Sequence, residues 1–164
     1  MVFLVAAPTD SGPIERMRAL CEIAWAFLEV GASVLAWPSG RSAWHRDRLV
    51  DIAPSSISAE HAHLFVSFDV AGHADDRLWV RTFGMRQFGL PDLACTATNT
   101  PEDFESADVL FNSLPPYIIK RQQPLPLGDT LDLEHRKWKV TESGISQVPC
   151  LQSDFGIQVF THIG

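Results

Sequence analysis

Four side chains with metal-binding chemistry lie in the middle of the sequence: His61, His63, His73 and Asp75. On a strand, His61 and His63 would project to the same side, because successive residues alternate between faces. His73 and Asp75 fall in a polar stretch that would form the tip of a hairpin. Imidazole and carboxylate groups suit zinc or another divalent ion. The competing interpretation is an exposed strand face beside a solvated loop, which we favour because spacing alone does not establish the convergent geometry of a metal site.

Other reactive groups lack the partners that catalysis requires. Cys95 would be a nucleophile only with a histidine and an orienting acid beside it, and its face-sharing neighbours Leu93 and Ala97 are typical of a core. We therefore interpret Cys95 and Cys21 as buried structural thiols. Thr9–Gly12 precedes a predicted helix but carries no phosphate-loop pattern, which favours a capping role. With no catalytic motif and no Cys-x-x-Cys spacing, the sequence predicts no cofactor and favours a protein that is not an enzyme.

Residues 1–60 predict a β-α-β unit followed by a weaker helix. Val2–Ala7 is apolar on both faces, as in an interior strand. A helix with a broad apolar stripe begins at Pro13, which suits the first helical position, and ends at Gly31. Ala32–Trp37 is the second strand, and residues 43–53 carry the weaker helical pattern.

The rest of the chain predicts further strands and one more helix. His63–Val70 alternates in polarity and would pair with Leu78–Thr82 as a hairpin. Asp92–Thr98 forms the next strand, and the following helix is capped by Thr100 and broken by Pro115–Pro116. Three short alternating runs close the chain: Thr130–Leu133, Trp138–Thr141 and Ile157–Ile163. This order predicts a single α+β domain over residues 1–164, with a mostly antiparallel sheet, about three helices packed on one face and the N-terminal β-α-β unit.

The segment 82–92, Thr-Phe-Gly-Met-Arg-Gln-Phe-Gly-Leu-Pro-Asp, is the most unusual in the sequence. Two Phe-Gly pairs, a methionine and a leucine give it too many large apolar groups for a solvated loop. We predict a compact turn that folds its aromatic rings inward and uses glycine where other residues resist the backbone angles. The proline then favours an extended conformation that leads into the next strand. The residues assigned to this structural motif are Thr82, Gly84, Phe88, Gly89, Pro91 and Asp92.

This segment, extended to residues 81–93, resembles the bacterial domain-of-unknown-function family 4261. The resemblance covers roughly residues 61–164, with residues 1–60 similar to the region that usually precedes the domain. It includes the strand Leu64–Phe68, Tyr117 and the turn at residues 128–130. Ala94 stands where the family commonly places a second acid, so no carboxylate pair forms with Asp92. The resemblance implies a fold, and no activity comes with it.

Composition narrows the classes of partner. The 164 residues are 46% hydrophobic and carry a formal net charge of −7, so the chain has material for a core and an acidic surface that repels nucleic acid and anionic membranes. No stretch approaches the ~18 apolar residues of a membrane span. Val2–Ala7 lacks the basic flank of a signal peptide, which predicts a cytoplasmic location.

Two hypotheses about function follow from the sequence. The first is a non-enzymatic binding or accessory module of the immunity type, whose acidic face meets an unidentified and basic protein partner; a homo-oligomer is compatible with it. The second is a small metal-dependent hydrolase built on His61, His63 and His73 with Asp75. We favour the first, because the sequence contains no recognisable catalytic motif.

Overall fold

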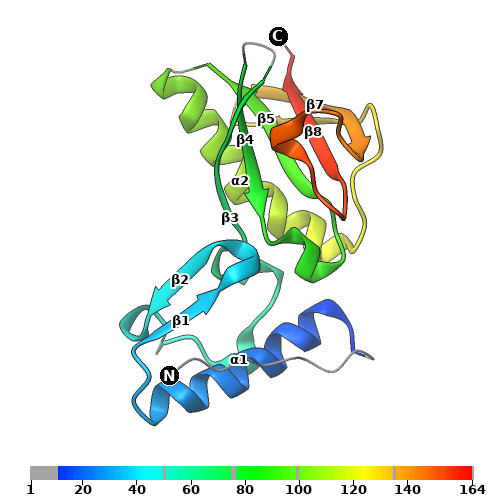
Figure 1. Cartoon of the computed structure of the whole chain (residues 1–164). Helices are drawn as coiled ribbons and strands as arrows, with labels where there is room; N and C mark the ends of the chain where they lie inside the picture. The colour runs from blue at the N-terminus through cyan, green and yellow to red at the C-terminus, as the bar shows by residue number, and fades with distance from the viewer. Residues whose placement is uncertain (1–10, 50, 75–76, 99, 135, 164) are drawn as a thin grey trace.

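The computed structural model describes residues 11–49, 51–74, 77–98, 100–134 and 136–163. Within them, the α-helices α1 (Pro13–Glu29) and α2 (Pro101–Arg121) accompany two sheets (Figure 1). The small sheet pairs β1 (Val34–Trp37) with β2 (Ser42–His45). The large sheet has the strand order β3-β4-β5-β8-β7-β6, with bounds Ser67–Ala74, Arg77–Phe83, Asp92–Ala97, Ile157–His162, Arg136–Gly144 and Thr130–Leu133 in that order.

Short 3-10 helices occupy many of the connections. In the described part of the chain they are η1 (Pro38–Gly40), η2 (Arg46–Arg48), η3 (Pro54–Ser56), η4 (Ala59–Leu64), η5 (Met85–Phe88) and η6 (Pro149–Leu151). Among all the helices described, none combines the length and the apolar character needed to cross a bilayer.

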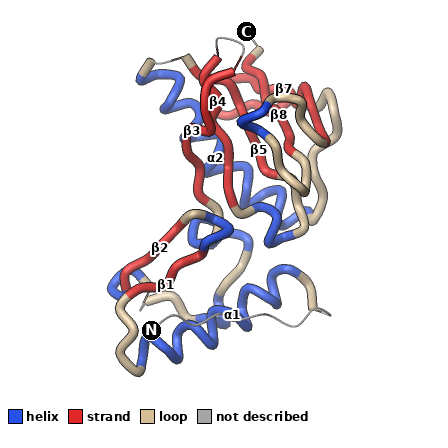
Figure 2. The backbone as a smooth tube through the Cα atoms, viewed as in Figure 1, coloured by secondary structure: helices blue, strands red, loops and turns tan. Residues whose placement is uncertain are grey.

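The predicted α+β class and the mostly antiparallel large sheet are confirmed, since β5 and β8 form its one parallel pair within the described residues. Helix α2 lies along one face of this sheet, whereas α1 lies beside the small sheet (Figure 2). The predicted first strand, Val2–Ala7, falls outside the described residues. The strand expected after the helix is β1, and its described partner is β2, in a tight antiparallel hairpin.

The helix predicted over residues 43–53 is wrong. This stretch contains β2 and then η2, and the indole Nε1 of Trp44 donates to the carbonyl of Leu64 at 3.0 Å. Trp44 therefore packs across the small sheet toward η4. Pairing with β1 stabilises residues 42–45 as a strand, although their sequence has a weak helical pattern. Tertiary contacts here override the local helical preference.

The strand predicted over His63–Val70 also begins later than expected and runs on to Ala74. Residues 59–64 form η4, and β3 begins only at Ser67. At the start of η4, the backbone N–H of Ser58 lies 3.3 Å from Nδ1 of His61, which completes a capping box. The alternation that suggested a strand arises because Leu64 and Val66 are buried for different reasons, one in the helix and one in the connection.

Helix α2 continues through Pro115–Pro116 to Arg121, so the predicted break there is wrong. Each interior proline removes a backbone hydrogen bond and costs about 3 kcal/mol. The helix buries a long apolar stripe against the sheet, and each large side chain contributes about 1.5–3 kcal/mol. That burial offsets the lost bonds. The stripe comprises Ala107, Leu110, Phe111, Leu114, Ile118 and Ile119.

The two faces of the large sheet carry different cores. On the α2 side, Val80, Leu93 and Phe160 belong to the main hydrophobic cluster. On the opposite face, Trp79 packs with residues of β5, β8 and η6 in a second, smaller cluster. Because strand residues alternate, Arg81 and Phe83 share the face of Trp79. The charged side chain of Arg81 therefore lies on the sheet face opposite α2, where η6 also packs.

The small sheet meets the large one at a contact between backbones. A Cβ atom on Gly84 would lie 2.3 Å from the carbonyl oxygen of Phe65 and 2.9 Å from Cα of Gly40. A Cβ on Gly40 would meet the same carbonyl oxygen at 1.9 Å. The side-chain Nε2 of Gln87 donates to this oxygen at 3.0 Å. No side chain fits between these segments, so the joint requires glycine on both sides.

We expect Gly84→Ala to destabilise the protein far more than Gly89→Ala. Gly84 has φ +112° and no space for a methyl group, whereas Gly89 has φ +70° with nothing near its added Cβ. The left-handed conformation alone costs alanine about 1–2 kcal/mol. We therefore expect about 1 kcal/mol for Gly89→Ala and at least twice that for Gly84→Ala in urea unfolding. Equal losses for the two variants would contradict the tight joint.

The start of α2 is held by a carboxylate rather than by its predicted cap. Thr100 makes no side-chain capping bond. Instead, Oδ2 of Asp103 accepts hydrogen bonds from the backbone N–H and the hydroxyl of Thr98, at 2.8 and 2.5 Å. Arg136, on β7, lies 3.5 Å from the other carboxylate oxygen. The Thr98 bonds, with the Arg136 charge, lower the pKa of Asp103.

This lowered pKa gives a testable pH dependence. Because the folded pKa of Asp103 lies below its unfolded value of about 3.9, its contribution is complete above that value and is lost as the pH falls through the folded pKa. The gap in unfolding free energy between wild type and Asp103→Asn should therefore shrink between pH 6 and about pH 3. Asp108→Asn, an exposed change on the same helix, serves as the control. A gap that widens in acid would refute the assignment.

Candidate functional site

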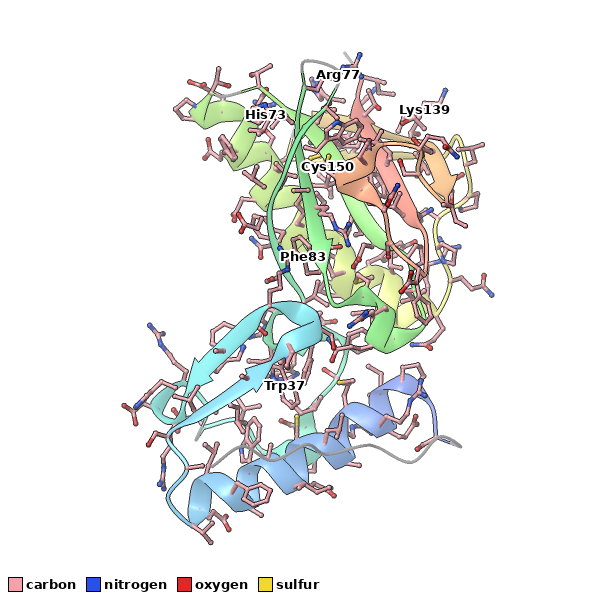
Figure 3. The ribbon with its side chains drawn as sticks, viewed as in Figure 1. Trp37, His73, Arg77, Phe83, Lys139 and Cys150 are labelled. Atoms are coloured by element: carbon pink, nitrogen blue, oxygen red, sulfur yellow. The ribbon has the colours of Figure 1, made fainter. Side chains whose placement is uncertain are left out.

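A polar pocket of about 490 Å³ opens on the sheet face opposite α2. Its floor is made by Arg81 and Phe83 of β4 and by Asp92 at the start of β5. One wall is the η1 turn with Arg41, and the other is the segment 150–154, which begins inside η6. Figure 3 shows Phe83 where the large sheet meets the β1–β2 hairpin, with Cys150 on η6 farther from that hairpin.

A buried ion pair forms the floor of this pocket. Nη2 of Arg81 lies 3.0 Å from Oδ2 of Asp92, and the two residues are 9% and 4% exposed. Nη1 of Arg81 donates to the carbonyl of Gln152 at 3.0 Å, and the other oxygen of Asp92 accepts from the backbone N–H of Met85. Burial raises the pKa of Asp92, while the charge of Arg81 acts in the opposite direction. Both carboxylate oxygens are thus occupied by donors of the protein itself.

The predicted structural motif surrounds this ion pair. The hydroxyl of Thr82 accepts from the backbone N–H of Leu93 at 2.8 Å, which ties the ends of β4 and β5. Between them, η5 forms a turn flanked by Gly84 and Gly89, both with positive φ. Phe88 is buried, and its ring meets that of Phe65 edge-on at 6.2 Å. The half-buried Pro91 then leads into Asp92.

Two guanidinium groups flank the ring of Phe83. The guanidinium carbon of Arg41 lies 3.8 Å from the ring centroid and that of Arg81 lies 4.7 Å from it. Arg41 is exposed and ends η1 in a left-handed conformation with φ +50°, which is uncommon for a residue other than glycine. Arg86, also exposed, contributes a third guanidinium to the lining. The pocket is therefore rich in cations on a chain of net negative charge.

The metal-binding candidates do not converge in the described structure. His61 and His63 lie on η4, not on a strand, with ring centroids 6.3 Å apart. His73 lies near the far end of β3 (Figure 3), roughly 20 Å from the start of that strand at Ser67 by the rise per residue. Asp75 falls outside the described residues. Among the residues that are described, no group of three or more His, Cys, Asp or Glu is placed to hold a metal ion.

The cysteines of the core have the structural role expected of them. Cys21 and Cys95 are fully buried, and desolvation raises the pKa of each thiol to about 12. A thiol with so high a pKa stays protonated near neutral pH, which agrees with a structural role in the core. Cys150 is half-buried and lines the pocket.

Sequence reasoning missed the residues that line the pocket walls. Alternation along β4 places Arg81 on the face of Trp79, which is a usable signal for a charged group on a covered face. Nothing in the sequence marks Arg41, which follows an ordinary Pro-Ser-Gly turn 40 residues earlier in the chain. Gln152 and Asp154 likewise follow no pattern.

Comparison with known families supports the resemblance stated above. The family described as Domain of unknown function (DUF4261) matches residues 81–151. The match runs from β4 to η6, so it contains the ion pair, the η5 turn and Cys150 but not Arg41 or Asp154. No curated protein and no solved structure matches the chain.

A double-mutant cycle measures how strongly Arg81 and Asp92 stabilise the fold through their ion pair. Asp92→Leu or Arg81→Met alone leaves one buried charge without a partner, and each should cost about 3 kcal/mol in urea unfolding. The double variant should cost less than the sum by at least about 1 kcal/mol. The half-exposed pair of Arg136 and Asp103 is the matched control, with an expected coupling below about 0.5 kcal/mol. If the losses in unfolding free energy of the two single variants simply add in the double variant, Arg81 and Asp92 do not stabilise the fold as a pair.

Proposed function

We propose that this protein is a non-enzymatic binding module whose ligand site is the pocket between the η1 turn and the segment 150–154. The observation that carries the proposal is a cavity of about 490 Å³ over a buried ion pair, with charged side chains converging on it from three separate parts of the chain. Pockets of this size suit small organic ligands.

The chemistry of the floor favours binding over catalysis. Asp92 is the buried acid in the cavity, and a raised pKa in a cleft is a feature of general acids. Its two oxygens, however, accept from Arg81 and from the backbone N–H of Met85. A carboxylate held by two protein donors is poorly placed to exchange a proton with a ligand, so its role here is to orient Arg81.

A basic protein partner and a cytoplasmic location stay predictions from the sequence. A protein partner is compatible with the pocket, because an accessory module can combine a small-ligand site with a separate contact surface. The hydrolase hypothesis has no support from the described histidines, because His73 lies on β3, away from His61 and His63 on η4.

The proposal is tested by fragment binding to isotope-labelled protein. We expect fragments from a panel of anionic, neutral and cationic compounds to shift the backbone amide signals of residues 38–41, 81–86 and 150–154. Ser153→Trp, which places a large ring in the cavity lining, should weaken those fragments by at least about tenfold. Gln147→Trp lies on an exposed position outside the lining and should leave their binding unchanged. Fragments that bind elsewhere, or that ignore Ser153→Trp, would defeat the proposal.

A further inference from the structure

We infer that the ligand of this pocket carries an oxyanion, a carboxylate or a phosphoryl group, which Arg81, Arg41 and Arg86 receive. The inference rests on the proposed function and specifies the chemistry of the ligand. It follows from a count of hydrogen-bond donors, from the placement of unpaired cations and from the charge balance of the lining.

Arg81 has donors left over although it is buried. A guanidinium has five N–H groups in a fixed planar fork. Three acceptors meet it among the described residues: the carbonyl of Thr82, the carbonyl of Gln152 and the carboxylate of Asp92. One hydrogen on each terminal nitrogen therefore remains without a protein acceptor. Arg81 lines the cavity, so an acceptor of a ligand can reach these donors there in place of water.

Arg41 and Arg86 bring two further cations to the same cavity. Within the described part of the chain, neither forms an ion pair, and Arg81–Asp92 is the one ion pair of the lining. The guanidinium carbon of Arg41 lies 3.8 Å from the centroid of the Phe83 ring, a contact that occupies none of its N–H donors. A planar edge of donors matches the paired oxygens of a carboxylate or phosphoryl group.

The charges of the lining do not balance without a ligand. Three arginines face two acids, Asp92 and Asp154. Asp69 lies opposite Arg81 in the β3–β4 ladder but does not line the cavity, and its carboxylate accepts from the backbone N–H of Val70. One negative charge from a ligand would neutralise the lining. The volume also leaves room for an uncharged body beside Pro38 and Ala71.

Four ligands that each carry a phenyl ring and differ in the charged or neutral group attached to it test which chemistry the pocket prefers. They are benzoate, phenylphosphate, benzyl alcohol and benzylamine. Titrated into isotope-labelled protein, benzoate or phenylphosphate should bind at the pocket at least about tenfold more tightly than the neutral and cationic ligands. The comparison of the first two distinguishes a carboxylate from a phosphoryl ligand. Arg41→Met should weaken the preferred anion by about tenfold, because it removes a charged donor. Asp154→Asn should strengthen it, because it removes an opposing charge.

Arg48→Met is the matched control, since Arg48 is exposed and lies outside the pocket; anion binding should not change. Equal binding of benzyl alcohol, or anion binding that Arg41→Met leaves intact, would overturn the inference while the pocket still served as a binding site. Failure of all four ligands overturns the inference too. If the fragment panel also fails to reach the pocket, the proposed function falls with it.

Discussion

The buried ion pair between Arg81 and Asp92 is the constraint on which the rest of this structure depends. Two charges removed from water cost several kcal/mol each, so such a pair persists only where further hydrogen bonds complete it. Here the completing groups come from separate elements: the backbone of Met85 in η5 and the carbonyl of Gln152 after η6. The pair thereby sets β4 and β5 against each other, orients the turn between them and anchors the segment that covers the second hydrophobic cluster.

The joint between the two sheets explains why a cavity exists beside this pair. At Gly40 and Gly84 the backbones approach so closely that no side chain separates them. The small sheet is therefore held at the end of β4, where Phe83 and Arg81 point outward from the large sheet. Charged groups on that floor cannot be covered by apolar side chains without losing solvation. The space between Arg41 and the segment 150–154 stays open as a polar pocket.

Much of the fold could be predicted from the sequence, and the failures have a common cause. Alternation located β5, β6 and β8 closely, and the glycines of the η5 turn have the positive φ that was expected of them. The predictions failed at residues 43–53, at His63 and at Pro115–Pro116, where contacts with distant residues decide the conformation. Trp44 reaches Leu64, and α2 passes through its prolines because the sheet buries its apolar stripe. Local preference was the weaker influence in each case.

By itself, the sequence determined the turn, the strand faces and the buried thiols, because each depends on steric and hydrophobic properties of neighbouring residues. It placed Asp92 correctly at the start of β5 but supplied no partner for it. Only the tertiary structure decided that Arg41 would lie over the ring of Phe83, that the carbonyl of Gln152 would accept from Arg81, and that His73 would lie on a different element from His61 and His63. These contacts join residues that are tens of positions apart in the sequence. They form only when the whole chain packs, and the local spacing of residues does not encode that packing.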